Sequence, residues 1–273
     1  MRISVLNDNI VYKRGLVAEH GLSIRIETNE KTIVFDVGQS GVFFQNGIVM
    51  KCSMANVDAI VLSHGHYDHC GGMNYLLRQD VKCPPVYVRK EAFTEKVSAN
   101  KDKTLYRNTG IAWNPEDIKE LHQIEKPLTE IFQNVFLLGN IPMNNSFEKR
   151  EASFFVLKDG KYLADDMRDE QMLIIRENGG LFVFSGCSHC GIINSLNHVK
   201  RVFKEEPIYM VMAGMHLLRA DKERIEKTVE ALKEINPGIV IPLHCTGLEA
   251  ISYIKQSLGG RCQLAETGAV FNL

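Results

Sequence analysis

The chain has 273 residues, of which 45% are hydrophobic and 24% are charged, so it holds enough apolar material for the core of a globular protein. Its formal net charge of −1 gives no electrostatic preference for nucleic acid or for an anionic membrane. No apolar run approaches the roughly 18 residues of a membrane span, and the N-terminus lacks a signal-peptide pattern. We therefore expect a cytoplasmic protein that acts on a small molecule, and the sequence predicts no particular oligomeric state.

The first part of the chain predicts strands. Residues 22–28 alternate between apolar and polar side chains, a polar pair follows, and residues 32–35 are apolar again. This pattern predicts a hairpin with one solvated face. The fully apolar run Val57–Leu62 predicts a buried strand.

The stretch from Arg89 to Arg150 differs from the rest. It is rich in charge, holds the single tryptophan, Trp113, and shows no clear strand before Val135–Leu138. Long segments of this kind are usually functional or mobile. We predict one domain over residues 1–273, in which residues 89–150 form a lid-like, helical insertion over a site.

The second half switches between strand and helix periods. Residues 154–157 and 162–164 flank a turn and predict a hairpin, and Ile239–Leu243 predicts a buried strand. Apolar stripes at helical spacing predict three helices, around residues 193–203, 221–235 and 251–258. The mixture predicts an α/β fold, best described as a sandwich of two mixed β-sheets with helices on the outer faces.

The strongest chemical signal is His64-Gly65-His66-Tyr67-Asp68-His69, which follows the predicted buried strand and precedes Gly71-Gly72. Neutral imidazole and carboxylate oxygen are ligands that suit zinc, iron or manganese. The alternative is a solvated polar loop, but four ligand-type residues within six positions after a core strand favour a metal site.

Three more histidines also stand just after apolar strands, namely His189, His216 and His244. Ligands gather where the strands of an α/β sheet end, so these residues favour one shared metal site. The remaining histidines lack this context, and we expect them on the surface or in helices: His20, His122 and His198.

The motif with Gly71-Gly72 resembles the signature of the metallo-β-lactamase superfamily, and Phe35-Asp36-Val37-Gly38 resembles its first motif. The sequences around His189, His216 and His244 resemble one branch of it, which includes dihydropterin–ribofuranosyl-aminobenzene phosphate synthases. The resemblance runs from Asp36 to the C-terminal strand. It implies an αββα sandwich with one or two metal ions at its open edge.

By position, the resemblance implies that His64, His66 and His189 hold one ion, while Asp68, His69 and His244 hold a second. Asp36 would support the metal-binding loop. Such ions lower the pKa of a bound water and give a hydroxide nucleophile, which Asp68 would orient.

Two further residues extend this prediction. The superfamily places a bridging acid where this chain offers Asp165-Asp166, so Asp166 is a candidate bridging ligand, with a solvated turn as the alternative. His216 is a candidate general acid, with a buried structural histidine as the alternative.

The seven cysteines motivate a competing hypothesis. Cys70, Cys190 and Cys245 each follow a proposed ligand histidine, and Cys187 lies two residues before His189. Thiolates at these positions would bind a soft metal or an iron–sulfur cluster, and make the protein a redox or electron-transfer protein. Two other cysteines would complete the set: Cys52 and Cys83. The simpler alternative is that the cysteines pack as small hydrophobic residues.

The leading hypothesis is a metal-dependent hydrolase that acts on a phosphorylated or pterin-like small molecule. Basic residues in or beside the insertion are candidates for holding an anionic substrate group, although each alone is more often plain surface charge. They are Lys103, Arg107, Lys149 and Arg150. A binding module with a degenerate site fits less well, because the histidine set is nearly complete.

Overall fold

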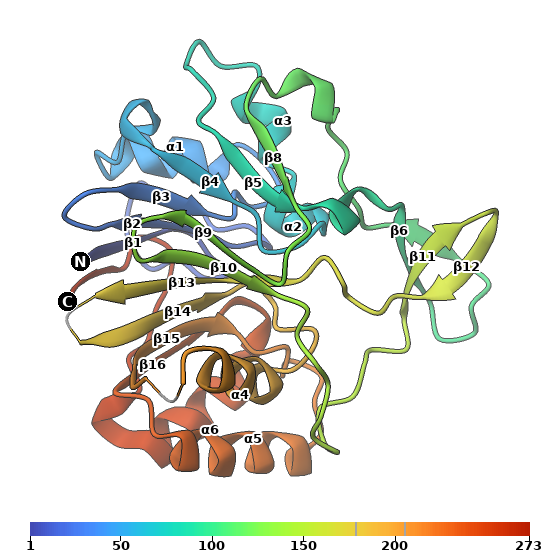
Figure 1. Ribbon diagram of the computed structural model, residues 1–273, viewed down its shortest axis with the longest axis vertical. Helices are drawn as coiled ribbons and strands as arrows, with labels where there is room; N and C mark the ends of the chain where they lie inside the picture. The colour runs from blue at the N-terminus through green and yellow to red at the C-terminus, as the bar shows by residue number, and fades with distance from the viewer. Residues whose placement is uncertain (178, 205) are drawn as a thin grey trace. The chain divides into compact units, whose positions relative to one another are not determined.

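The computed structural model describes residues 1–177, 179–204 and 206–273 (Figure 1). They form two compact units, each of which is described by itself. The first unit comprises residues 1–125, 151–169 and 266–273, and the second comprises residues 126–150 and 170–265.

The main sheet of the first unit has seven strands and is mixed. Strands β1, β2, β3 and β17 pair antiparallel, whereas β3, β4, β5 and β8 run parallel. In spatial order the strands are β17 (Val270–Asn272), β1 (Arg2–Asn7), β2 (Ser23–Glu27), β3 (Thr32–Phe35), β4 (Ala59–Val61), β5 (Val86–Arg89) and β8 (Leu121–Ile124). Because β3, β4 and β5 are parallel, the loops that follow them leave the same edge of the sheet.

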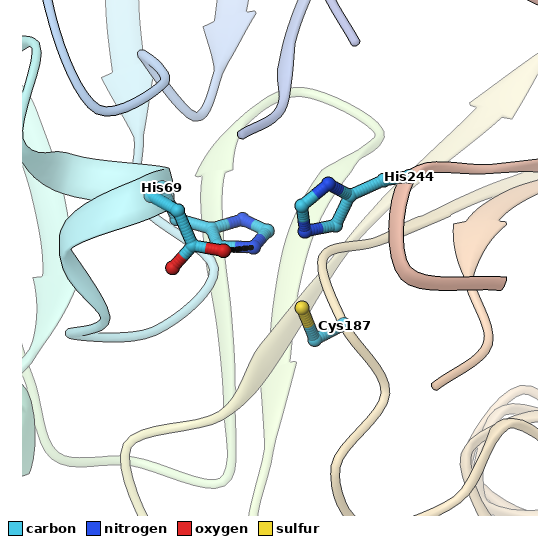
Figure 2. A group of neighbouring side chains, drawn as sticks. His69, Cys187 and His244 are labelled. Carbon is cyan, nitrogen blue, oxygen red and sulfur yellow. Dashed lines mark ion pairs between the residues drawn. The ribbon is translucent and has the colours of Figure 1, made fainter. Parts of the chain in front are cut away.

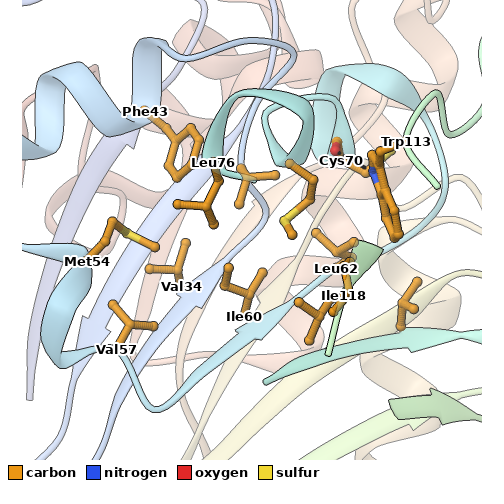
Figure 3. Packing of buried hydrophobic residues seen from close by; sticks show 14 of the residues in the cluster. Val34, Phe43, Met54, Val57, Ile60, Leu62, Cys70, Leu76, Trp113 and Ile118 are labelled. Atoms are coloured by element: carbon orange, nitrogen blue, oxygen red, sulfur yellow. Dashed lines mark hydrogen bonds between the residues drawn. The ribbon is translucent and has the colours of Figure 1, made fainter. Parts of the chain in front are cut away.

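A hydrophobic cluster packs the helices of the first unit against this sheet. Phe43 comes from α1 (Val42–Val49), Leu76 from α3 (Met73–Leu76), Val34 from β3 and Ile60 from β4 (Figure 3). Short 3₁₀ turns at 54–56, 90–93 and 115–117 connect the elements. This cluster fixes the strand end from which the histidine motif departs.

A second, four-stranded antiparallel sheet also belongs to the first unit. Its order is β12 (Lys161–Ala164), β11 (Phe154–Lys158), β6 (Lys96–Ala99) and β7 (Tyr106–Asn108). The hairpin of β11 and β12 is the one predicted from the sequence.

The sheet of the second unit has six strands and is also mixed. In spatial order they are β16 (Ile239–Leu243), β15 (Ile208–Gly214), β14 (Gly180–Ser185), β13 (Gln171–Glu177), β10 (Val135–Gly139) and β9 (Leu128–Phe132). Strands β14, β15 and β16 run parallel, so the loops after them also leave one edge.

Three helices accompany this sheet, and all three were predicted. Helix α4 (Ile192–Val202) packs against α5 (Lys222–Ile235), which packs against α6 (Leu248–Leu258) (Figure 1). The Asp221 side chain caps α5 by accepting a hydrogen bond from the Arg224 N–H at 2.8 Å. Further 3₁₀ turns lie at 244–246 and 259–261.

Two sequence predictions about local structure are wrong. Residues 89–150 carry strands β6, β7, β8 and β9 before β10, and their only helical parts within the described chain are 3₁₀ turns, so the insertion is not helical. The β2–β3 hairpin lacks the expected solvated face, since Arg25 is buried and donates to the Ser53 carbonyl at 2.7 Å. Whether one domain spans 1–273 with a lid at 89–150 stays a prediction.

None of the helices in the described parts of the chain is both long and apolar enough to cross a membrane.

Candidate metal centre

The histidine motif lies where β4 ends and the one-turn helix α2 (Tyr67–Cys70) begins. His66 is the N-cap of α2 and has extended backbone angles. The change from extended to helical backbone brings alternate side chains together: the ring of His64 lies 4.7 Å from that of His66 and 4.3 Å from that of His69, between centroids. All three imidazoles are buried.

A hydrogen-bond network fixes the orientation of two of these rings. The Asp36 carboxylate accepts from Ser63 N–H at 2.7 Å, from Ser63 Oγ at 2.7 Å and from His69 Nδ1 at 2.6 Å. Ser63 Oγ also lies 2.9 Å from His64 Nδ1. In the neutral His69 ring, donation from Nδ1 to Asp36 leaves Nε2 unprotonated, which is the form that a metal ligand needs. This nitrogen lies 3.7 Å from Asp68 Oδ2.

The backbone of Asp36 adopts an unfavourable conformation in this arrangement. Its φ of 57° lies in the left-handed region, which non-glycine residues rarely adopt. Asp36 follows β3, the parallel neighbour of β4, so its side chain reaches the motif from the next strand end. The supporting role that the sequence resemblance implied for Asp36 fits this geometry.

Asp68 has a partner that the sequence analysis missed. Its Oδ2 lies 3.2 Å from Nε2 of His20, a residue that we expected on the surface without a role. The His20 side chain is 51% exposed, whereas that of Asp68 is 10% exposed. His20 therefore lies at the solvent side of the Asp68 carboxylate.

Burial keeps His66 neutral. It lowers the pKa of His66 from its ordinary value to about 4, and the nearby Lys96 charge acts in the same direction, against Asp68 and Asp169. The ring of Phe154 covers His66 at 4.8 Å between centroids. A neutral imidazole with an apolar cover is suited to binding a divalent ion.

The second unit gathers its own donors at the ends of its parallel strands. Cys187 and His189 follow β14, His216 follows β15, and His244 follows β16. Cys187, His189 and His216 each offer one donor atom within 4.8 Å of the others. The rings of His189 and His216 lie 4.5 Å apart between centroids. The sequence prediction that strand ends collect histidines is confirmed within this unit.

The backbone at these strand ends is strained. His216 and His244 have φ values of 49° and 52°, in the left-handed region. Such strain persists where surrounding contacts hold the residue, and it clusters at functional sites. Figure 2 shows His69 on α2 of the first unit, and Cys187 and His244 on the segments that follow β14 and β16 of the second unit.

Comparisons with known proteins agree with this chemistry. A family model described as the metallo-beta-lactamase superfamily matches residues 17–136. The chain is 34% identical to "Uncharacterized protein MJ0448" of Methanocaldococcus jannaschii, over 93% of this chain and 94% of that protein. It is also similar, with 34% identity and a TM-score of 0.86, to the crystal structure of Tm1679, a metal-dependent hydrolase of the beta-lactamase superfamily, covering 100% of this chain and 99% of that one. The chain belongs to the metallo-β-lactamase superfamily.

Another protein similar to this chain is named for a specific activity. The 7,8-dihydropterin-6-methyl-4-(beta-D-ribofuranosyl)-aminobenzene-5'-phosphate synthase of the same organism is 30% identical, over 90% of this chain and 87% of that protein. Membership confirms the predicted α/β fold class, in agreement with the two mixed sheets and their helices. The superfamily binds divalent metals, and each unit here contains the donors for such binding.

The structure gives no support to Asp166 as a bridging ligand. Asp166 is partly exposed and pairs with Arg168 at 2.5 Å. Within the described chain it belongs to none of the groups of close metal-type donors. Its neighbour Asp165 is buried and binds Lys96 at 2.6 Å, so it has a structural partner instead.

The iron–sulfur hypothesis is not supported. Such a cluster needs several thiolates, but no group of close donors among the described residues contains two cysteines. Cys70 lies inside the hydrophobic cluster of the first unit (Figure 3). Cys52 belongs to the same cluster, and Cys83 packs against it. Burial raises the pKa of Cys70 well above its ordinary value and that of Cys83 to about 11, so both thiols stay protonated. These three cysteines are packing residues, as the simpler alternative held.

The cysteines of the second unit lie closer to the donors. The Cys245 Sγ accepts a hydrogen bond from the His216 N–H at 3.3 Å and contacts the Cys187 carbonyl at 3.5 Å. Cys190, for which a soft-metal role was predicted, is buried, and its N–H is bound by Glu170 at 2.8 Å. These contacts place Cys245 beside the donors, in a role that supports the loop.

Sequence reasoning also missed four buried acids and bases that hold the loops in place. Lys96 binds Asp165 and Asp169 at 2.6 and 2.9 Å in the first unit. Glu148 and Glu170 accept backbone N–H groups at the start of α4 in the second. The signal in the sequence was the group of acidic residues between positions 165 and 170, of which only Asp165 and Asp166 were treated as candidates.

Proposed function

We propose that this superfamily member is a metal-dependent hydrolase. The proposed metal ligands are the histidines of the motif and Asp68 in the first unit, and His189 and His244 in the second unit, as superfamily membership implies. The donor set fits a divalent ion, since it consists of neutral imidazoles and a carboxylate. The observation that carries the proposal is the Asp36 network, because it fixes the tautomer of a predicted ligand, as in known metal sites.

The bound ions would supply Lewis acidity and lower the pKa of a coordinated water toward neutral pH. The chain's own residues do the rest. Asp68 would orient the attacking water by accepting a hydrogen bond at Oδ2, and His20 holds that carboxylate at 3.2 Å. His216 is the proposed proton donor to the leaving group, from a ring that is part-buried next to His189.

We further propose a phosphorylated or pterin-like small molecule as the substrate. The Tyr67 N–H of the motif donates to the carbonyl of Thr109, the residue directly after strand β7, at 2.9 Å. Burial and the charge of Asp68 raise the pKa of Tyr67. The positive charge of Arg107, which lies on β7 two residues before Thr109, acts in the opposite direction. Arg107 thus places an exposed positive charge near the motif, where an anionic substrate group would bind.

Aromatic side chains on the same small sheet supply apolar faces. The rings of Tyr106 and Tyr162 are stacked 4.1 Å apart, and Lys103 Nζ lies 5.1 Å from the centroid of the Phe155 ring. A flat heterocycle with an anionic group matches this combination of rings and cations. Lys149 and Arg150 belong to the second unit and stay predictions.

The test is turnover of a panel of phosphomonoesters, phosphodiesters, phosphorylated pterins and lactams, with zinc, manganese or iron. We expect a phosphorylated compound to be hydrolysed only with metal, and Arg107→Ala to raise its KM while leaving that of an uncharged analogue unchanged. Lys82→Ala is a matched control, since Lys82 is an exposed cation that pairs with Glu120 at 3.5 Å. Equal effects of both variants would refute the proposed anion site.

A further inference from the structure

Asp169 holds the backbone of the histidine motif. Its side chain is 1% exposed, and Oδ2 accepts the Gly65 N–H at 2.7 Å while Oδ1 binds Lys96 Nζ at 2.9 Å. Gly65 is the residue between His64 and His66. A Cβ at Gly65 would lie 2.5 Å from the Ala92 carbonyl oxygen, so the loop is confined on its other side as well. Asp169 therefore holds the backbone segment that carries both histidines.

Glu170 does the same for the metal-type donors of the second unit. Its side chain is also 1% exposed, and its two oxygens accept the N–H groups of His189 at 2.6 Å and of Cys190 at 2.8 Å. Glu148 binds the following turn, by accepting the N–H groups of Ile193 and Asn194 at 2.9 and 2.8 Å. At the start of α4, Glu148 therefore caps the helix, whereas Glu170 holds the backbone of His189.

Asp169 and Glu170 are consecutive in the chain. Their Cα atoms are therefore held about 3.8 Å apart by one peptide unit. Each carboxylate is buried and bound to a backbone N–H at or beside a predicted ligand, which is the arrangement that fixes ligand geometry in metal proteins.

We propose that the dipeptide Asp169-Glu170 is a positioning element that sets both metal-ligand loops, Asp169 through Gly65 and Glu170 through His189. This inference rests on the proposed metal function, but not on the identity of the substrate. Neither residue belongs to a group of close metal-type donors among the described residues, so each acts through the backbone that it holds.

The experiment compares two substitutions with two matched controls in the full chain. Asp169→Asn and Glu170→Gln remove the charge that binds a ligand loop. The control for Asp169 is Asp165→Asn, because Asp165 also binds Lys96 but does not bind Gly65. The control for Glu170 is Glu148→Gln, because Glu148 also binds backbone N–H groups at the start of α4 but not that of His189. Zinc affinity is measured by competition with a chromogenic chelator, without substrate. The thermal unfolding of each metal-free variant and the absorption spectrum of its cobalt form are recorded alongside.

We expect zinc affinity to fall about 10–100-fold in Asp169→Asn and Glu170→Gln, the loss typical of residues that orient metal ligands, with an altered cobalt spectrum. The controls should keep the zinc affinity and the cobalt spectrum of the wild type, even if their unfolding temperature falls as much as that of the test variants. If a test variant does not fold, Asp169→Glu or Glu170→Asp keeps the charge, moves the oxygens by one methylene and should show the same loss.

Wild-type affinity and spectrum in the test variants, or equal losses in the controls, would overturn the proposal. A wild-type protein that binds zinc in the expected manner but hydrolyses nothing would refute the proposed function and leave this inference standing. A wild-type protein that binds no divalent metal would overturn both.

Discussion

The substitution Asp36→Asn isolates the electrostatic part of the network beneath the motif. The amide has nearly the same shape and keeps one oxygen for the Ser63 N–H. It places an NH₂ group where Oδ2 now accepts from Ser63 Oγ at 2.7 Å and from His69 Nδ1 at 2.6 Å. An NH₂ group can only donate, so both of these contacts must change.

The size of the effect follows from these contacts. Hydrogen bonds to charged groups contribute about 1.5–3 kcal/mol each, so the loss of two sets an upper limit of about 3–6 kcal/mol. His69 can recover one bond by taking its other tautomer and accepting at Nδ1. The expected loss in the free energy of unfolding of the metal-free protein is therefore about 1.5–3 kcal/mol.

The tautomer change has a larger consequence for metal binding. It moves the proton of His69 to Nε2, the nitrogen that lies 3.7 Å from Asp68 Oδ2. A protonated nitrogen cannot ligate a metal, so we expect zinc affinity to fall about 10–100-fold. Urea unfolding, chelator competition and the ¹⁵N shifts of the His69 ring measure the three effects separately.

Asp58→Asn is the matched control. Asp58 also accepts from a backbone N–H, that of Thr32 at 2.8 Å, and from a cation, Lys31 at 3.0 Å. Among the described residues it belongs to no group of close metal-type donors. This variant should bind zinc like the wild type. If Asp36→Asn also binds zinc with unchanged affinity, or if His69 keeps its tautomer, the reasoning about the network is refuted.

Three further predictions concern two buried charges and the backbone at Gly65. Lys96→Met leaves Asp165 and Asp169 buried without their cation. It should lower the free energy of unfolding, measured by urea titration, by about 3–5 kcal/mol. A loss below about 1 kcal/mol would contradict this prediction. Burial raises the pKa of Glu148 despite its three N–H donors. A carboxyl group with a raised folded-state pKa stabilises the fold most below its unfolded pKa of about 4.3, and this contribution is lost as the pH rises through the folded value. Glu148→Gln should therefore destabilise the protein more at about pH 4 than at about pH 7, and the opposite order in urea unfolding would show the sign to be wrong. Gly65→Ala forces a backbone shift, because its Cβ would meet a carbonyl oxygen at 2.5 Å, and should weaken zinc binding while leaving the fold, by circular dichroism, intact.

Much of the site could be predicted because its signals are local. The six-residue motif combines ligand chemistry with a preceding apolar run, and His189, His216 and His244 each follow a strand whose apolar run is legible in the sequence. Parallel strands bring such ends to one edge, as β14, β15 and β16 do.

The missing parts depend on contacts between distant residues. Asp169 binds the N–H of Gly65 across 104 positions, and a backbone donor leaves no trace in the side-chain pattern. Arg25 alternates with apolar neighbours as an exposed residue would, yet it is buried, and its guanidinium donates to the Ser53 carbonyl and the Glu27 carboxylate. Strands such as β7, which is only three residues long and largely exposed, show no apolar period to detect.

The most direct test of the account is metal-dependent hydrolysis by the wild type and by His66→Ala. The protein is stripped of metal, reloaded with zinc, manganese or iron, and assayed for bound metal and for turnover of phosphate esters. We expect the wild type to bind at least one ion and to hydrolyse a phosphorylated compound, with activity lost on chelation and restored on reloading. His66→Ala should bind less metal and turn over no substrate. A wild type that binds no metal, or a His66→Ala variant with undiminished turnover, would contradict the central claim.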